Sequence, residues 1–238
     1  MIEDLRARVA GAFKDLARVG LRPVWPPNRS EYFLAAAEAT TDPARLLNSV
    51  LGAGAVGRPT PISELAAQQL SPLWPIDPAT QQFLGGFVRA VRPKRVFETG
   101  VADGASSRII LDALEENGEG RLWSVDVLPG AGAIARESPA VRRWEFVVLP
   151  ARGRAAAFRT AIRAVRPLDV FLHDSDHSYP WQSFEYREAW SVLAPGGWLL
   201  SDDIDASYAL LDLARRHNLR PWILAGPRKL FGVLRKPR

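Results

Sequence analysis

The sequence contains no cysteine and no long apolar run. Without cysteine, disulfides, thiolate chemistry and Cys-ligated zinc are all excluded. No apolar run reaches the roughly 18 residues that a transmembrane helix needs, and the first residues lack the apolar core of a signal peptide. We therefore expect a cytoplasmic protein of ordinary globular composition, with no membrane partner.

The sequence also lacks the interleaved basic and aromatic residues that are typical of RNA-binding proteins. Its net charge of +5 would by itself be compatible with nucleic acid. The arginines, however, are scattered along the chain, apart from a basic tail at residues 227–238. The charge therefore indicates a solvated surface, and we expect no nucleic-acid partner.

The chain divides into a helical N-terminal part, residues 1–76, and an alternating part, residues 77–238. In the first part, apolar residues recur at helical spacing over 1–20, a helix starts near Ser30, and Asp42-Pro43 begins a third. Strand signals are missing there. We expect a helical extension that serves as a lid or as a dimer arm in a homo-oligomer, or that only packs against the rest.

The second part alternates short apolar strands with helices. The expected strands cover 96–98, 121–126, 145–149, 168–172 and 197–201, and the expected helices cover 106–116, 154–165, 181–193 and 206–217. Two last runs, 221–224 and 229–234, form a hairpin-like pair. The pattern predicts an α/β fold with a mostly parallel, seven-stranded sheet and helices on both faces.

A glycine turn follows the first expected strand, with Glu98, Gly100 and Gly104 in the pattern E-x-G-x-x-x-G. A dinucleotide-binding turn has a glycine where Glu98 stands, and a carboxylate there would repel phosphate, which disfavours an NAD(P) oxidoreductase. The pattern resembles motif I of the class I S-adenosylmethionine (AdoMet) methyltransferases. Asp126 ends the next strand, where a carboxylate can accept both hydroxyls of a ribose.

Acidic side chains follow two further strands: Asp174 comes after 168–172, and Asp202 and Asp203 come after 197–201. Neighbouring strand ends lie about 5 Å apart, so we expect these carboxylates to converge and to repel one another unless a cation or proton lies between them. Hard oxygen ligands suit Mg²⁺ or a similar divalent ion. The alternative is that the acids cap the helices that follow.

Three segments carry a more specific resemblance: D-S-D-H-S-Y at 174–179, L-x-P-G-G at 193–197 and S-D-D-I at 201–204. They resemble metal-dependent small-molecule O-methyltransferases, above all those that methylate sugar hydroxyls of macrolides and related natural products. The resemblance covers about residues 77–204. It implies the Rossmann-like class I methyltransferase fold, AdoMet and Mg²⁺ as cofactors, and a small hydroxylated acceptor, such as a natural-product sugar or a catechol-like compound.

The resemblance also implies a cofactor site at the glycine turn. Its expected residues are Glu98, Thr99, Gly100, Asp103, Ser106 and Asp126. Glu98 and Gly100 would border the methionine part of AdoMet, with Asp103 and Ser106 near it, and Asp126 would bind the ribose.

For the chemistry, the resemblance implies that Asp174, Asp202 and Asp203 hold Mg²⁺ and that His177 is the general base. An alcohol is a poor nucleophile, and a metal ion would lower its pKa while the imidazole takes its proton. Asp174 would thus belong to both the metal site and the catalytic site. His173 is a weaker base candidate, because strand alternation turns it toward the cover of the sheet.

Other functions on the same fold remain open at this point. A hydroxylase group associated with cephalosporin biosynthesis shows similar motifs, and a binding protein could keep the AdoMet pocket without turnover. Enzymes that methylate nucleic-acid amino groups usually carry N/D-P-P-Y/F where this chain has D-S-D-H-S-Y, so that function is disfavoured.

Overall fold

The structure is a computed structural model that describes residues 29–52, 76–226 and 229–238. The helix expected over residues 1–20 and the proline-rich kink at 72–75 lie outside these residues. Among the helices in the described part, none is both long enough and apolar enough to cross a membrane.

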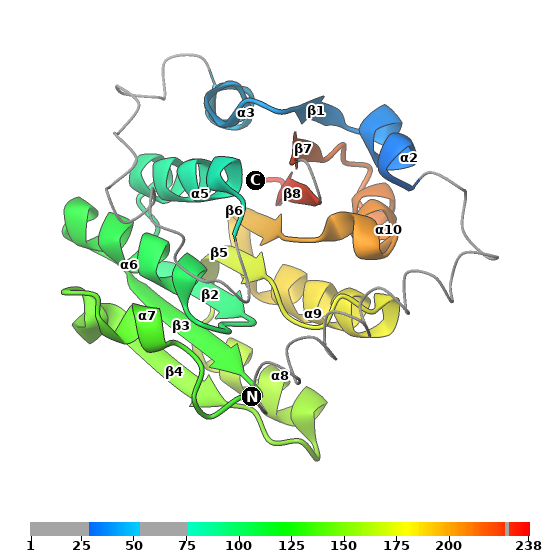
Figure 1. The fold of residues 1–238 in the computed structure, drawn as a ribbon. Helices are drawn as coiled ribbons and strands as arrows, with labels where there is room; N and C mark the ends of the chain where they lie inside the picture. The colour runs from blue at the N-terminus through cyan, green and yellow to red at the C-terminus, as the bar shows by residue number, and fades with distance from the viewer. Residues whose placement is uncertain (1–28, 53–75, 227–228) are drawn as a thin grey trace, which may run out of the picture.

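An eight-stranded sheet forms the centre of the molecule (Figure 1). Its strands are β1 (Glu38–Thr40), β2 (Arg95–Thr99), β3 (Arg121–Asp126), β4 (Trp144–Val148), β5 (Leu168–His173), β6 (Leu193–Ser201), β7 (Trp222–Ala225) and β8 (Leu230–Arg235). They are arranged in the order β1-β7-β8-β6-β5-β2-β3-β4. Every neighbouring pair is parallel except those of β8, which runs antiparallel to β6 and β7. The expected mostly parallel α/β sheet is confirmed.

Helices cover both faces of this sheet, as the sequence predicts. The helices are α2 (Arg29–Ala36), α3 (Pro43–Leu51), α5 (Pro78–Val91), α6 (Ala105–Asn117), α7 (Ala133–Arg136), α8 (Arg154–Ala164), α9 (Tyr179–Val192) and α10 (Ala209–Arg216), with 3-10 turns η2 (Val141–Arg143) and η3 (Ile204–Ala206). One apolar core joins the sheet to α3, α5 and α6, and a second joins it to α8, α9 and α10.

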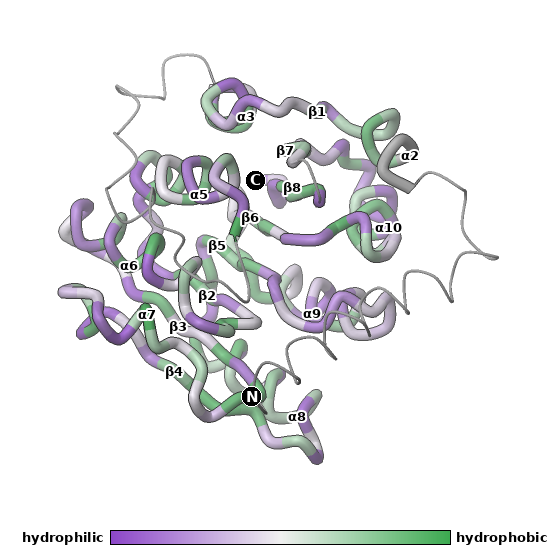
Figure 2. The backbone as a smooth tube through the Cα atoms, in the orientation of Figure 1, coloured by the Kyte–Doolittle hydropathy of each residue, from purple (hydrophilic) through white to green (hydrophobic). Residues whose placement is uncertain are grey.

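Alternation along the central strands builds the two cores. Phe97 and Phe171 stack with ring centroids 6.3 Å apart, on the face where Phe158 of α8 meets Phe97 edge-on. Val96 and Val170 lie in the other core, against α5 and α6. Both strands are almost entirely buried, and their hydrophobic stretches run through the centre of the molecule (Figure 2). This alternation also decides the face on which each polar residue of these strands lies.

Two helices begin at an aspartate cap, and the one at Asp42 was expected. Asp42 accepts hydrogen bonds at Oδ1 from the backbone N–H groups of Ala44 (2.8 Å) and Arg45 (3.3 Å). Asp77 accepts one from the N–H of Ala79 (2.9 Å). In both helices a proline occupies the first turn, where its missing N–H costs nothing.

The N-terminal part differs from the expectation of a purely helical extension and raises the strand count from seven to eight. Its strand β1 pairs in parallel with β7, with Glu38 opposite Trp222. Arg220 donates a hydrogen bond to the carbonyl of Ala37 just before β1 (3.0 Å). A strand of three residues has too little local pattern to be recognised, and its pairing partner lies far along the chain. The expected domain boundary after residue 76 stays a prediction.

Candidate active site

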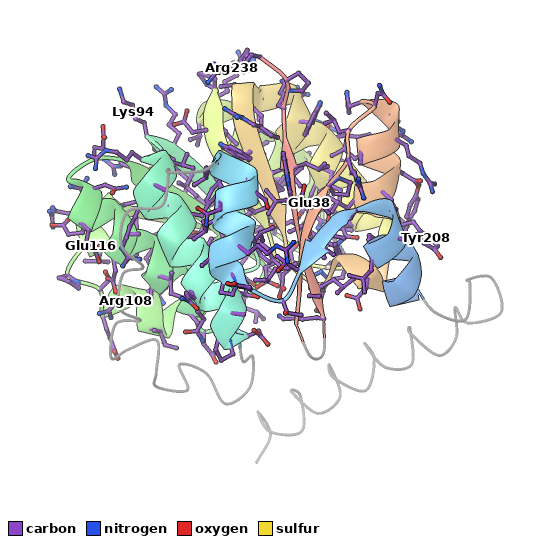
Figure 3. All side chains as sticks on the ribbon, turned by 90° about the horizontal axis from the view of Figure 1, so that it is seen from above. Glu38, Lys94, Arg108, Glu116, Tyr208 and Arg238 are labelled. Atoms are coloured by element: carbon purple, nitrogen blue, oxygen red, sulfur yellow. The ribbon has the colours of Figure 1, made fainter. Side chains whose placement is uncertain are left out.

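The carboxyl ends of β2, β5 and β6 meet at one edge of the sheet, and backbone hydrogen bonds tie the loops that follow them. The N–H of Asp174 donates to the carbonyl of Thr99 (2.9 Å), and the N–H of Asp202 donates to the carbonyl of His173 (2.9 Å). Lys94 and Arg238 mark the opposite edge, where the parallel strands begin (Figure 3). The loops that carry Gly100, Asp174 and Asp202 therefore share one edge of the sheet, which is where open α/β sheets bind ligands.

Gly100 allows the closest approach between two of these loops. Its φ is +79°, and a Cβ on this residue would lie 1.9 Å from the carbonyl oxygen of Asp174. Its N–H donates to the carbonyl of Val125 (3.0 Å), and the carbonyl of Asp103 accepts from Ile134 (2.9 Å). Only glycine fits at this position, because any side chain would collide with backbone.

Asp126 holds the glycine turn from the neighbouring strand. Its Oδ2 accepts hydrogen bonds from the N–H groups of Val101 (2.8 Å) and Ala102 (3.0 Å), and its Oδ1 accepts one from Leu128 (2.8 Å). The turn-forming and the ligand-binding interpretations of this acid are therefore compatible, since Oδ1 keeps the capacity for one more donor.

Glu98 lies in a different environment from the expected one. Alternation turns it toward α6, where its buried carboxylate accepts hydrogen bonds from Ser106 (2.6 Å), Ser107 (2.5 Å) and Ser124 (2.7 Å). Burial raises the pKa of this carboxyl, although the three hydroxyls oppose the shift. Glu98 and Ser106 bond to each other and tie α6 to β2 and β3, and Glu98 has no exposed surface, while the expected role of both residues in cofactor binding stays a prediction.

Glu185 of α9 organises the other side of this edge, and sequence reasoning missed it. This buried carboxylate accepts hydrogen bonds at Oε2 from Thr99 Oγ1 (2.8 Å) and His173 Nδ1 (2.6 Å). At Oε1 it accepts from Ser175 Oγ (3.0 Å) and Trp181 Nε1 (2.6 Å). The Thr99 side chain thus bonds to α9, and His173 is fully buried, as strand alternation predicted. The sequence signal that could have revealed it is its position between two aromatic residues, Phe184 and Tyr186.

His177 lies between two of the expected acids. Its Nε2 is 3.7 Å from Asp174 Oδ1 and 3.5 Å from Asp203 Oδ2, and the side chain is 7% exposed. Its ring stands edge-on to that of His173, with centroids 5.3 Å apart. The structure therefore brings the expected base together with Asp174 and Asp203.

Neither α9 nor η3 is capped by the side chain of an expected acid. Ser178 is the N-cap of α9, and Asp203 precedes η3 in a left-handed conformation, with φ of 46° and no side-chain cap hydrogen bond. Asp176 instead accepts from the N–H of Ser178 (3.0 Å), and Asp205 accepts from that of Leu230 (3.2 Å). The capping alternative for Asp203 is therefore not supported.

A lysine shares the acidic cluster, and sequence reasoning did not include it. Lys229 Nζ donates to Oδ2 of the buried Asp202. Burial raises the pKa of Asp202, the Lys229 ammonium opposes this shift, and the Asp203 charge adds to it. Across residues 29–52, 76–226 and 229–238, no three His, Cys, Asp or Glu side chains are arranged to hold a metal ion. As placed here, the three acids do not fit the expected Mg²⁺, because an ammonium already bonds to one of them.

The chain carries a recognisable domain around this edge. Residues 97–204 match the family model of a methyltransferase domain. The matched segment runs from β2 to η3 and contains the glycine turn, His177 and the three acids, whereas Lys229 lies beyond it. No protein of curated function matches the sequence.

Several solved structures share the fold of this chain. The O-methyltransferase TomG from Streptomyces achromogenes, solved with S-adenosylmethionine, is 16% identical over 84% of this chain and 100% of its own, with a TM-score of 0.58. An O-methyltransferase from Bacillus cereus, solved with S-adenosylhomocysteine, is 16% identical over 79% of this chain and 88% of its own, with a TM-score of 0.53. These similarities establish the class I methyltransferase fold.

MycE, from the mycinamycin biosynthetic pathway, is a larger protein with the same fold. Its complex with Mg, S-adenosylhomocysteine and mycinamycin VI is 17% identical over 76% of this chain and 56% of its own, with a TM-score of 0.52. The expected relation to macrolide-sugar enzymes stays a prediction at this identity.

Proposed function

We propose that this protein transfers the methyl group of AdoMet to a hydroxyl group of a small molecule. The observation that carries the proposal is the position of His177 between Asp174 and Asp203, at the sheet edge that holds the glycine turn. The methyltransferase-domain match over 97–204 supports it, as do the AdoMet and S-adenosylhomocysteine complexes of the similar structures.

The glycine turn is the part of the chain that fits AdoMet. Gly100 brings backbone, without a Cβ, against the loop of Asp174, and Asp126 orders the next two N–H groups. Asp126 Oδ1 accepts a single N–H of the chain and can accept a ribose hydroxyl as well. When bound, AdoMet supplies an electrophilic methyl group on a sulfonium. Asp103 is proposed to border it, while Glu98, Thr99 and Ser106 hold the surrounding elements in place.

His177 is proposed to take the proton of the acceptor hydroxyl at Nε2. This atom faces Asp174 Oδ1 and Asp203 Oδ2, whose charges stabilise the imidazolium that forms. The ring is almost wholly buried, which excludes water from the base and holds its direction. No step is assigned to Mg²⁺, because Lys229 bonds to an acid of the expected ligand set.

Replacing His177 by alanine tests the assignment. We expect turnover to fall by about 10²-fold or more, while calorimetry shows S-adenosylhomocysteine binding unchanged. His217→Ala is the matched control, because this histidine packs on Trp190 with ring centroids 4.7 Å apart and lies at the end of α10. Near-normal turnover of His177→Ala would remove His177 as the base.

The acceptor class is tested with labelled AdoMet and a panel of glycosides and catechols. Transfer to hydroxyl groups of either class supports the proposal. Binding of S-adenosylhomocysteine without transfer to any member would favour a hydroxylase-like or non-catalytic AdoMet-binding protein. No binding at all would overturn the function and leave the fold.

A further inference from the structure

Lys229 reaches the acidic cluster because of the antiparallel hairpin at the end of the chain. It directly precedes β8, and β8 runs antiparallel to β6 with Gly232 opposite Ser201. The start of β8 therefore lies beside the carboxyl end of β6, where Asp202 follows. In sequence the two residues are separated by 27 positions, and the fold makes them neighbours.

The ammonium of Lys229 is held among carboxylates rather than in solvent. Its side chain is 19% exposed, and its Nζ donates to Asp202 Oδ2. A lysine side chain is ordinarily protonated near neutral pH, and here the ammonium bonds to a buried carboxylate, so Lys229 supplies a positive charge at the site.

The position of this ammonium disfavours the binding of a metal ion at the acidic cluster. Mg²⁺ requires close to six oxygen ligands in a regular octahedron, and one oxygen of Asp202 already accepts from Lys229. The other oxygen, Oδ1, is buried and has no hydrogen-bond partner within the described ranges. An ammonium and a divalent ion that share one carboxylate repel each other strongly in a buried place.

We propose that Lys229 is the resident cation of the Asp174–Asp202–Asp203 cluster and that the chain needs no divalent metal ion there. Lys229 is a positioning residue: it balances the charge of Asp202 and so keeps Asp203 and Asp174 available to His177. The catalytic part of this inference rests on the proposed function, whereas the statement about metal binding does not.

The first experiment measures Mn²⁺ binding to the full chain by electron paramagnetic resonance. We expect no stoichiometric Mn²⁺ site in the wild-type chain. Lys229→Met should gain one equivalent, with an affinity at least about tenfold higher, because repulsion by the ammonium is removed. If Lys229 had a merely structural role, replacing it would not create a Mn²⁺ site.

The matched control is Lys236→Met. This lysine lies just past the other end of β8, where Nζ donates to the carbonyls of Trp190 and Leu193 (2.8 Å each). We expect no Mn²⁺ gain in this variant. Lys229→Gln is a second test variant, because its amide still donates to Asp202 and so protects folding while removing the charge. Lys229→Gln should also gain one equivalent of bound Mn²⁺, whereas Lys229→Arg, which keeps the positive charge, should not.

Two results would overturn the inference. One is a wild-type chain that binds one equivalent of Mn²⁺ and loses it in Asp202→Asn. The other is a folded Lys229→Met or Lys229→Gln chain that binds Mn²⁺ no better than wild type.

Methyl transfer with and without EDTA separates this inference from the proposed function. Transfer that survives EDTA supports both. Transfer that EDTA abolishes and Mg²⁺ restores would refute the role of Lys229 and leave the methyltransferase. If S-adenosylhomocysteine does not bind, the proposed function fails, and the Mn²⁺ measurements still decide the question of the cation.

Discussion

Replacing Glu185 by glutamine should destabilise the protein without changing the size of the side chain. The carboxylate accepts four hydrogen bonds, two at each oxygen. The glutamine oxygen can still accept from Ser175 and Trp181. Its NH₂ group would then face Thr99 Oγ1, which can rotate to accept, and His173 Nδ1, which cannot accept while it carries its proton.

The expected loss in the free energy of unfolding follows from these contacts. His173 can keep its bond only by moving its proton to Nε2, a buried atom with no hydrogen-bond partner among the described residues. The bonds also lose the assistance of a charge, and charge-assisted bonds are worth about 1.5–3 kcal/mol whereas neutral ones are worth about 0.5–1.5 kcal/mol. The free energy of unfolding should therefore fall by about 2–3 kcal/mol. For a chain of this size the melting temperature should drop by about 5–10 °C.

Glu188→Gln is the matched control on the same helix. Glu188 pairs with Arg159 (2.9 Å) and Arg163 (3.1 Å), whose side chains are 42% and 51% exposed. Such exposed pairs are worth less than about 1 kcal/mol each. Thermal denaturation followed by circular dichroism compares the two variants. If Glu185→Gln melts at the same temperature as the control, the reasoning about the Glu185 hydrogen bonds is wrong.

Two further predictions concern the glycine turn and its support. Gly100→Ala should lose more than about 2 kcal/mol in urea denaturation, because its Cβ would meet the Asp174 carbonyl. Gly118→Ala, also at positive φ but with nothing within 4 Å, should lose about 1 kcal/mol; equal losses would contradict the packing argument. Burial raises the pKa of Glu98 in the folded protein, so the folded chain holds this proton more tightly than the unfolded chain. The resulting stabilisation is fully present below the ordinary pKa of 4.5 and is lost as the pH rises through the raised pKa. Glu98→Gln removes this dependence, so wild type should lose stability relative to the variant as the pH rises from the ordinary pKa of 4.5 through the raised pKa, and a stability difference that stays constant with pH would refute this reasoning.

The sequence predicted most of the fold because its signals there are local. The cap at Asp42 and the alternation of apolar strands with helices depend on residues a few positions apart. Strand β1 could not be recognised in this way, since three residues carry no period and their pairing energy comes from β7.

In the candidate site, too, local sequence signals predicted some contacts, and contacts between distant residues could not be predicted. His177 and Asp174 lie three positions apart in one motif, and their proximity follows from it. Glu98 also stands in a motif, but the face on which it lies depends on the pleat of β2 and on the serines of α6. Lys229 enters the site only through the register of β8 on β6, which no local pattern encodes.

Strand β1 has a consequence for the order in which the chain assembles. The hydrogen bond between Arg220 and Ala37 joins residues that are 183 positions apart. At a synthesis rate of about 5–20 residues per second, the residues of β1 leave the ribosome about ten to forty seconds before those of β7 exist. Among the strands in the described residues, the first to be synthesised is thus the one that must wait for β7, near the end of the chain, before it can pair.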